Sequence, residues 1–213
     1  WIDNIPPDKP VLIAGPTASG KSALAMYIAE TAGGIIVNAD ALQVFSNWRV
    51  LSARPSIAEE RRVKHVLYGH VDGDTNYSVG HWLRDITPYL IRRERPIIVG
   101  GTGLYFSALT KGLVDIPSIP QDILNLSEKR WKAEGLQALV VELDDETRDR
   151  IDIQNPMRVM RAWQVEKYTG KSIIAWHKEK LPPLLDQQNC TAIVFSSSVE
   201  WLNKRIAKRF EKM

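Results

Sequence analysis

Short apolar runs alternate with segments of helical periodicity along the first part of the chain. Val11–Ala14 is an apolar run between a proline and a glycine, which predicts a buried strand, and residues 34–38 predict a second one. Between them, residues 21–31 carry small and apolar side chains at helical spacing and end at paired glycines, which predicts a helix. Strand, helix and strand at this spacing form a βαβ unit, and such a unit implies a parallel sheet.

The same alternation continues to residue 116. Residues 77–93 carry one apolar stripe at helical spacing, residues 96–99 predict a third strand, and another helix starts at residue 104. Alternating strands and helices are typical of a doubly wound sheet, which binds its ligands beyond the carboxyl ends of its strands. We therefore predict an α/β fold in which helices flank a parallel sheet.

The pattern changes after residue 116. Residues 122–152 have the pattern of charged helices without a strand, and residues 157–169 predict a further helix. A last strand is expected at 192–195, and an amphipathic helix with a basic outer face at 199–213. The predicted parts are thus an α/β core at 1–116, a helical insertion at 117–156, and a return to the core with the basic helix at 157–213.

The composition is that of an ordinary globular protein, with 44% hydrophobic and 25% charged residues. No apolar run approaches the roughly 18 residues of a membrane span, and no basic segment followed by an apolar run marks a secretory signal. The lone Cys190 excludes an intrachain disulfide and fits a reducing compartment. The net charge of +3 is compatible with an anionic partner. The basic face of the last helix either binds such a partner or is only a solvated surface. We expect a monomeric cytoplasmic protein without a membrane partner.

Residues 15–22 match the phosphate-loop pattern G-x-x-x-x-G-K-[ST] at every fixed position. The glycines let successive N–H groups point at one phosphate, and the following helix adds its positive N-terminal end. The lysine of the pattern reaches the terminal phosphate, and the serine hydroxyl can bind Mg²⁺. The predicted diphosphate-binding residues are Gly15, Thr17, Ala18, Ser19, Gly20, Lys21 and Ser22, with Ser22 also the predicted metal ligand.

The loop does not identify its ligand as a nucleotide. Nucleotide hydrolases usually carry a second acid at the end of an apolar strand to hold Mg²⁺, but the strand at 96–99 runs into Gly-Gly-Thr-Gly. Asp40 is the more informative acid, because it follows the second strand at the edge where such sheets bind ligands. Its position alone is compatible with a turn or capping residue, with a general base, or with a metal-linked carboxylate.

Four blocks together resemble the tRNA dimethylallyltransferase (isopentenyl-diphosphate:tRNA transferase) family. They are Gly-Pro-Thr-Ala-Ser-Gly-Lys-Ser at 15–22; Ala-Asp-Ala-Leu-Gln-Val-Phe at 39–45 with Ser-Ala-Arg-Pro-Ser at 52–56; Val-Gly-Gly-Thr-Gly-Leu-Tyr at 99–105; and Asn-Pro-Met-Arg-Val-Met-Arg-Ala at 155–162 with Thr-Gly-Lys at 169–171. The blocks occur in the family's order over nearly the whole chain. Ala41, Gln164 and Leu124 stand where the family usually has Ser, Glu and Arg. Family members continue beyond the position of Met213, so we expect their C-terminal part to be missing here.

This resemblance implies a P-loop type of fold and transfer of a dimethylallyl group from dimethylallyl diphosphate, with Mg²⁺, to N6 of the adenosine 3′ of the anticodon, position 37, in the anticodon stem-loop of tRNA. The loop would bind the diphosphate. Asp40 would take the proton from the adenine amine, and Lys21, Thr102 and Arg161 would complete the catalytic set. The resemblance implies two groups of tRNA contacts: Asp40, Ala41, Leu42, Gln43 and Thr102 at the adenosine, and Met157, Arg158, Val159, Met160 and Arg161 elsewhere on the tRNA.

Three other functions use the same motifs. A small-molecule kinase would bind ATP and transfer phosphate, and it would need the Mg²⁺ acid that is missing after the strand at 96–99. A relative that prenylates free adenine nucleotides is disfavoured by the helical insertion and by the basic last helix. A non-enzymatic ATPase module that binds nucleic acid would need an adenine pocket and a sensor arginine.

Overall fold

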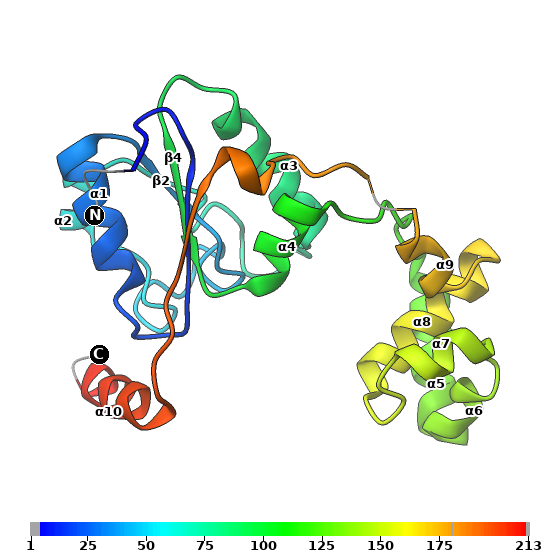
Figure 1. Ribbon diagram of the computed structural model, residues 1–213. Helices are drawn as coiled ribbons and strands as arrows, with labels where there is room; N and C mark the ends of the chain where they lie inside the picture. The colour runs from blue at the N-terminus through cyan, green and yellow to red at the C-terminus, as the bar shows by residue number, and fades with distance from the viewer. Residues whose placement is uncertain (1–4, 180, 212–213) are drawn as a thin grey trace. The chain divides into compact units, whose positions relative to one another are not determined.

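The computed structural model describes residues 5–179 and 181–211 and divides into two compact units (Figure 1). The chain up to Gly112 and from Pro183 onward forms the sheet unit, and Leu113–Pro182 form the helical unit. The predicted insertion spanned 117–156, whereas the structure groups 157–182 with the helices as well. The two ends of the helical unit lie side by side, because the Leu181 N–H donates to the Leu113 carbonyl at 3.1 Å.

The described part of the sheet unit contains a parallel sheet of five strands in the order β3-β2-β4-β1-β5. This confirms the predicted fold class. The strands predicted at 34–38, 96–99 and 192–195 are found within one residue of those ranges, whereas β3 was not predicted because two residues are too short to show alternation. The bounds are β1 Val11–Ala14, β2 Ile35–Asn38, β3 His65–Val66, β4 Pro96–Gly100 and β5 Thr191–Val194.

Helices cover both faces of this sheet (Figure 1). Alternate residues of β1 show why, since Val11 and Ile13 pack into one apolar core and Leu12 packs into the other. Helices α1 (Lys21–Ala32) and α2 (Ile57–Arg62) lie on the first face, and α3 (Val79–Leu90) and α4 (Gly103–Lys111) lie on the second. After β5 the chain forms α10 (Val199–Phe210), and a short 3-10 turn, η2 (Gln187–Asn189), precedes β5.

The helical unit has a separate apolar core. Val159, Met160 and Trp163 of α8 pack there against Leu139 and Val140 of α6. These apolar contacts explain why α8 belongs to this unit rather than to the sheet. Its helices are α5 (Gln121–Glu134), α6 (Leu136–Val140), α7 (Asp145–Arg150), α8 (Pro156–Thr169) and α9 (Ile173–His177).

The described part of the last helix agrees with the helix predicted at 199–213. Helix α10 runs from Val199 to Phe210 and is capped by Ser198, whose hydroxyl accepts a hydrogen bond from the Trp201 N–H. Residues 212 and 213 of the predicted helix lie outside the described residues. Within 5–179 and 181–211, no helix combines the length and apolar character that a membrane span requires.

Candidate active site

The phosphate loop connects β1 to α1 through left-handed backbone positions. Ala18 has φ 63° and Gly20 has φ 100°, and this curl turns successive peptide groups toward one side. Gly15 is required by close packing, because an added Cβ would lie 2.7 Å from Cβ of Phe195. No side chain caps the first turn of α1 at Gly20 among the described residues, so its N–H groups are open to an anion.

Lys21 is the cation that the loop positions. Its Nζ donates to the Pro16 carbonyl at 3.2 Å, and the side chain lines the cavity described below. Burial lowers the pKa of Lys21, and the nearby positive charge of Arg209 lowers it further, whereas Asp40 acts in the opposite direction. Burial therefore disfavours the protonated form of the amine, and a bound anion would stabilise that form.

The hydroxyl groups of the loop differ in their surroundings. Ser19 is buried, and its hydroxyl has no hydrogen-bond partner among the described residues. Thr17 and Ser22 are exposed, and Ser22 is the second residue of α1. A hydroxyl at this position suits Mg²⁺, which takes oxygen ligands and completes its shell with substrate phosphates and water. The described residues hold no group of three or more His, Cys, Asp or Glu side chains that could bind a metal without such help.

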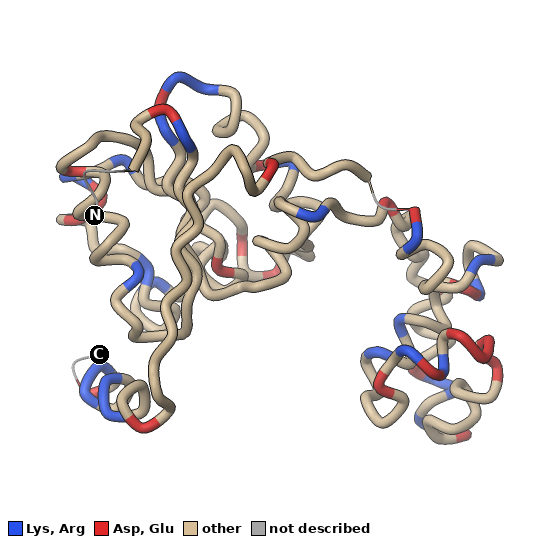
Figure 2. The backbone as a smooth tube through the Cα atoms, viewed as in Figure 1, with Lys and Arg blue, Asp and Glu red and all other residues tan. Residues whose placement is uncertain are grey.

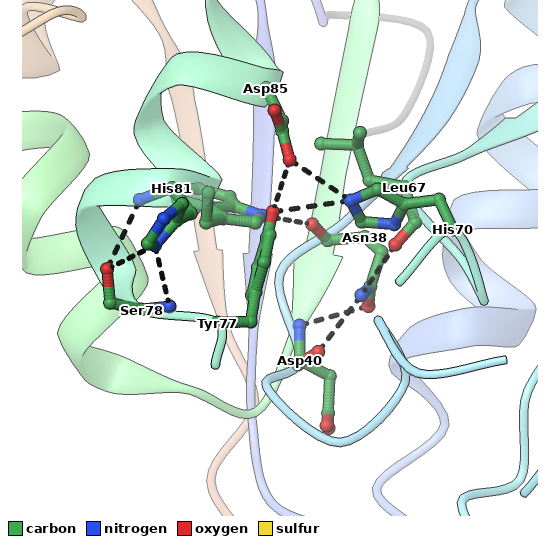
Figure 3. Close-up of polar contacts among 9 residues, drawn as sticks. Asn38, Asp40, Leu67, His70, Tyr77, Ser78, His81 and Asp85 are labelled. Carbon is green, nitrogen blue, oxygen red and sulfur yellow. Dashed lines mark hydrogen bonds and ion pairs between the residues drawn. The ribbon is translucent and has the colours of Figure 1, made fainter. Parts of the chain in front are cut away.

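Asp40 is held at the end of β2 by its neighbours (Figure 3). The buried Asn38 accepts a hydrogen bond from the Asp40 N–H at 2.9 Å and donates to the carbonyls of Asp40 and Leu67 at 2.9 and 3.0 Å. One carboxylate oxygen of Asp40 accepts from the Leu42 N–H at 2.9 Å. This local turn matches the structural interpretation of Asp40, and its hydrogen bond uses one of the two carboxylate oxygens.

Thr102 fixes the same loop from the neighbouring strand. Its N–H donates to the Ala39 carbonyl at 3.2 Å, and its hydroxyl accepts from the Ala41 N–H at 2.9 Å. The approach depends on Gly100, because an added Cβ would lie 2.0 Å from the Ala39 carbonyl oxygen. The Thr102 hydroxyl still has its own proton to donate. Asp40 and Thr102, which lie far apart in the sequence, are thus brought together at the carboxyl ends of β2 and β4.

A cavity of about 570 Å³ opens on the phosphate loop. Loop residues Ala18, Gly20, Lys21 and Ser22 line it, and Gln43 lines it from the segment after β2. The Gln43 amide donates to the carbonyls of Ser52 and Ala53 at 2.8 and 3.0 Å and so holds the wall of the cavity. Of the other residues predicted to contact adenosine, Ala41 is half-buried and Leu42 is 67% exposed.

Helix α10 contributes cations to this cavity, which the sequence did not assign. Arg205, Lys208 and Arg209 line it, and Nε of Arg205 donates to the Ala18 carbonyl of the phosphate loop at 2.8 Å. Figure 2 shows the basic residues gathered along α10. The three cations lie on one helix face because they are spaced at i, i+3 and i+4. This spacing is the sequence feature that could have predicted their shared target. Asn38 was also missed, and its signal was a polar residue that ends an apolar strand beside Asp40.

The predicted tRNA contacts on α8 lie in the helical unit. Met157, Arg158 and Arg161 expose their side chains, whereas Val159 and Met160 are buried in the apolar core. Contacts through the last two side chains are therefore unsupported, because these side chains hold the unit together. The predicted role of Arg161 at the departing diphosphate stays a prediction.

The sheet order, the phosphate loop and the strand-end cluster around Asp40 define a P-loop α/β protein of the kinase-like class. A family model described as IPP transferase matches residues 43–213, and one described as isopentenyl transferase matches residues 9–69. The chain belongs to the tRNA dimethylallyltransferase (IPP transferase) family, a family of prenyltransferases. The predicted family and enzyme class are confirmed.

Curated relatives support this membership along the whole chain. A tRNA dimethylallyltransferase of Ruegeria sp. (strain TM1040) is 55% identical over 214 residues, which cover 100% of this chain and 72% of the relative. One from Cereibacter sphaeroides (strain KD131 / KCTC 12085) is 53% identical and covers 100% of this chain, which spans 68% of that protein. The match therefore includes every motif on which the resemblance rested.

Solved structures agree on the fold. The full-length tRNA isopentenylpyrophosphate transferase from Bacillus halodurans aligns with a TM-score of 0.57 and 26% identity, covering 96% of this chain and 65% of that chain. A eukaryotic dimethylallyltransferase acting on tRNA aligns with a TM-score of 0.76 over 96% of this chain. Its identity is 23%, so this second likeness concerns the fold alone, and this chain spans about half of that protein, 53%.

Proposed function

We propose that this chain transfers a dimethylallyl group from dimethylallyl diphosphate to N6 of adenosine 37, 3′ of the anticodon, in tRNA and releases diphosphate. The observation that carries the proposal is the position of Asp40 beside the phosphate loop, because a Cβ added at Gly101 would lie 3.5 Å from both the Asp40 carboxylate and the Gly15 carbonyl oxygen. A carboxylate next to a diphosphate site is suited to removing a proton from a nucleophile that attacks the diphosphate ester. The named relatives are tRNA dimethylallyltransferases, which fits this acceptor.

The phosphate loop stabilises the leaving group of the reaction. The bond between the allylic carbon and oxygen breaks, and negative charge builds on the diphosphate. The N–H groups of the loop and the amine of Lys21 stabilise that charge, with Lys208 and Arg209 lining the same cavity. Mg²⁺, held by Ser22 and the diphosphate, would add charge stabilisation there.

Asp40 acts on the acceptor, the exocyclic amine of adenine. The amine forms the new C–N bond and gives up a proton, which the carboxylate of Asp40 accepts. The Thr102 hydroxyl, whose oxygen already accepts from Ala41, keeps a proton with which to orient the base. Because the target atom lies within a base, the adenine has to leave its stack in the anticodon loop before reaction.

The helical unit supplies an exposed basic face for the RNA. Met157, Arg158 and Arg161 are the predicted α8 contacts whose side chains reach solvent. Arginines at such positions neutralise RNA phosphates and stack on unpaired bases. The predicted helical tRNA-binding part thus includes α8, beyond the 117–156 range assigned from the sequence.

Mass spectrometry of tRNA nucleosides tests the proposal. The chain is incubated with unmodified tRNA, Mg²⁺ and dimethylallyl diphosphate in buffer without nucleotide, and the tRNA is then digested. We expect N6-dimethylallyladenosine and equimolar diphosphate, with the modification lost when adenosine 37 is replaced by guanosine. Product that forms only when ATP is present, or that maps to another position, would contradict the proposal.

A further inference from the structure

We propose that Tyr68 closes the apolar end of the diphosphate cavity and sets the length of the isoprenoid chain that the protein accepts. The proposal rests on the proposed function, because it concerns the donor substrate of that reaction. It assigns a role in specificity to a residue outside all the motifs of the sequence analysis.

The lining of the cavity is divided by chemistry. Lys21 of the phosphate loop and three cations of α10 line it on the side that we assign to the diphosphate, and the charged or polar side chains of Arg54, Glu59 and His65 also belong to the lining. Its apolar residues come from the sheet and the sheet-facing side of α1: Ile36 and Val99 are 1% and 2% exposed, and Met26 is 8% exposed. An allylic diphosphate has the same division, with a charged head and an apolar tail. The tail therefore belongs on the sheet side, where Tyr68 also lines the cavity.

The backbone around Tyr68 is set in an unusual conformation. Leu67 has φ 62° and Gly69 has φ 54°, and a left-handed leucine is uncommon and strained. The turn sends consecutive side chains to opposite faces: Leu67 packs into the core under α3 and α4, whereas Tyr68 packs against the core under α1. The Leu67 carbonyl accepts from Asn38, the residue that also holds Asp40 (Figure 3). The conformation that aims Tyr68 is thus tied to the active-site loop.

The ring of Tyr68 presents its apolar body to the cavity. It packs at an edge against the His65 ring, with centroids 5.5 Å apart, and it lines the cavity. Burial and the charge of Asp40 raise the pKa of Tyr68, so the phenol stays neutral. A neutral aromatic ring is a suitable wall for a hydrocarbon tail. Removing it would open a space about as large as one isoprene unit.

The test compares dimethylallyl diphosphate with geranyl diphosphate, which is one isoprene unit longer. Tyr68→Ala should shift the ratio of kcat/KM toward geranyl diphosphate by roughly 10- to 100-fold, the usual range for size discrimination in apolar pockets. Tyr68→Phe keeps the ring and should leave the ratio unchanged. Tyr27→Ala is the matched control, because Tyr27 is 52% exposed on α1 and does not line the cavity.

Calorimetric binding of the two diphosphates without tRNA separates this proposal from the proposed function. A shifted Kd ratio in Tyr68→Ala supports the role of Tyr68 even if no group is transferred to tRNA. An unchanged ratio in a folded Tyr68→Ala, or an equal shift in Tyr27→Ala, overturns it. Tyr68→Leu provides a smaller truncation if the alanine variant does not fold, and an unchanged ratio there overturns the proposal as well.

Discussion

The sheet unit and the helical unit both contain buried polar groups but use them differently. In the sheet unit, Asn38 at the end of β2 is hydrogen-bonded, but the Ser19 hydroxyl of the phosphate loop and Nε of Arg95 have no hydrogen-bond partner among the described residues. In the helical unit the buried side chains have partners: the Gln164 amide donates to the Ser127 hydroxyl at 2.7 Å, and the Thr147 hydroxyl donates to Asp144 at 2.5 Å. Pairing stabilises a fold, whereas an open polar atom at a fixed position costs stability and can serve a substrate.

The pairing in the helical unit extends to its charges. The Trp163 indole donates to one oxygen of Glu142 at 2.6 Å, and Arg130 donates to the other at 2.5 Å. These hydrogen bonds lower the pKa of Glu142, so the carboxylate stays charged and occupied. The comparison therefore predicts that substitutions in the sheet unit change chemistry more than stability, and that those in the helical core do the reverse.

Asp40→Asn should have the largest effect. The substitution keeps the oxygen that accepts from the Leu42 N–H but removes the basic carboxylate. Loss of a general base typically slows the chemical step by roughly 10²- to 10⁴-fold. We expect a loss in that range in single-turnover transfer, with a melting temperature close to that of the unchanged protein. Near-normal transfer, or a drop in melting temperature that explains the loss, would identify Asp40 as a turn residue only.

Lys21→Ala should weaken binding of the diphosphate substrate. A hydrogen bond to a charged group contributes about 1.5–3 kcal/mol, which corresponds to roughly 10- to 150-fold in Kd. Titration calorimetry measures the change. Lys64→Ala removes the same charge from a surface residue paired with Glu94, and it should bind normally. Equal weakening in both variants would point to net charge instead of a contact with Lys21.

The lowered pKa of Lys21 adds a pH dependence with a defined sign. Diphosphate binds the protonated amine, so affinity is full below the pKa and falls as pH rises through it. Because burial lowers that pKa, the fall should begin at lower pH than for an ordinary lysine. Lys21→Ala should lose this alkaline fall. Retention of the same fall in the variant would assign it to another group.

The sequence predicted those elements in which close backbone packing or a repeated spacing restricts the choice of residue. The phosphate loop and the strand ends at Asp40 and Thr102 fall into this class, because left-handed backbone and tight packing admit few residues. Helix α2 was missed, although its capping box of Ser56 and Glu59 was present, since six residues show little periodicity. The cations of α10 were seen without their target, because their contact with Ala18 joins residues far apart in the chain.

Ser127→Ala should destabilise the protein and leave diphosphate binding unchanged. It deprives the buried Gln164 amide of its acceptor, which costs about 1–3 kcal/mol. Urea unfolding followed by circular dichroism measures this loss. Adding Gln164→Leu removes the unpaired amide and should recover part of the stability, while the exposed Ser118→Ala is the neutral control. A weakened Kd for diphosphate would show that the helical core is not independent of the site.

Arg158→Gln should have the smallest effect and should act on RNA alone. Arg158 is exposed on α8, and a phosphate contact contributes about one unit to the slope of log Kd against log salt concentration. We therefore expect tRNA affinity to fall by a few-fold at low salt, the slope to decrease by about one, and diphosphate binding to stay the same. Lys132→Gln removes a charge from α5, where its contact with Glu128 spans 3.8 Å, and is the control for net charge. Filter binding at several salt concentrations gives both slopes. If the two variants behave alike, tRNA responds to the overall charge of the helical unit, and the exposed face of α8 has no specific contact.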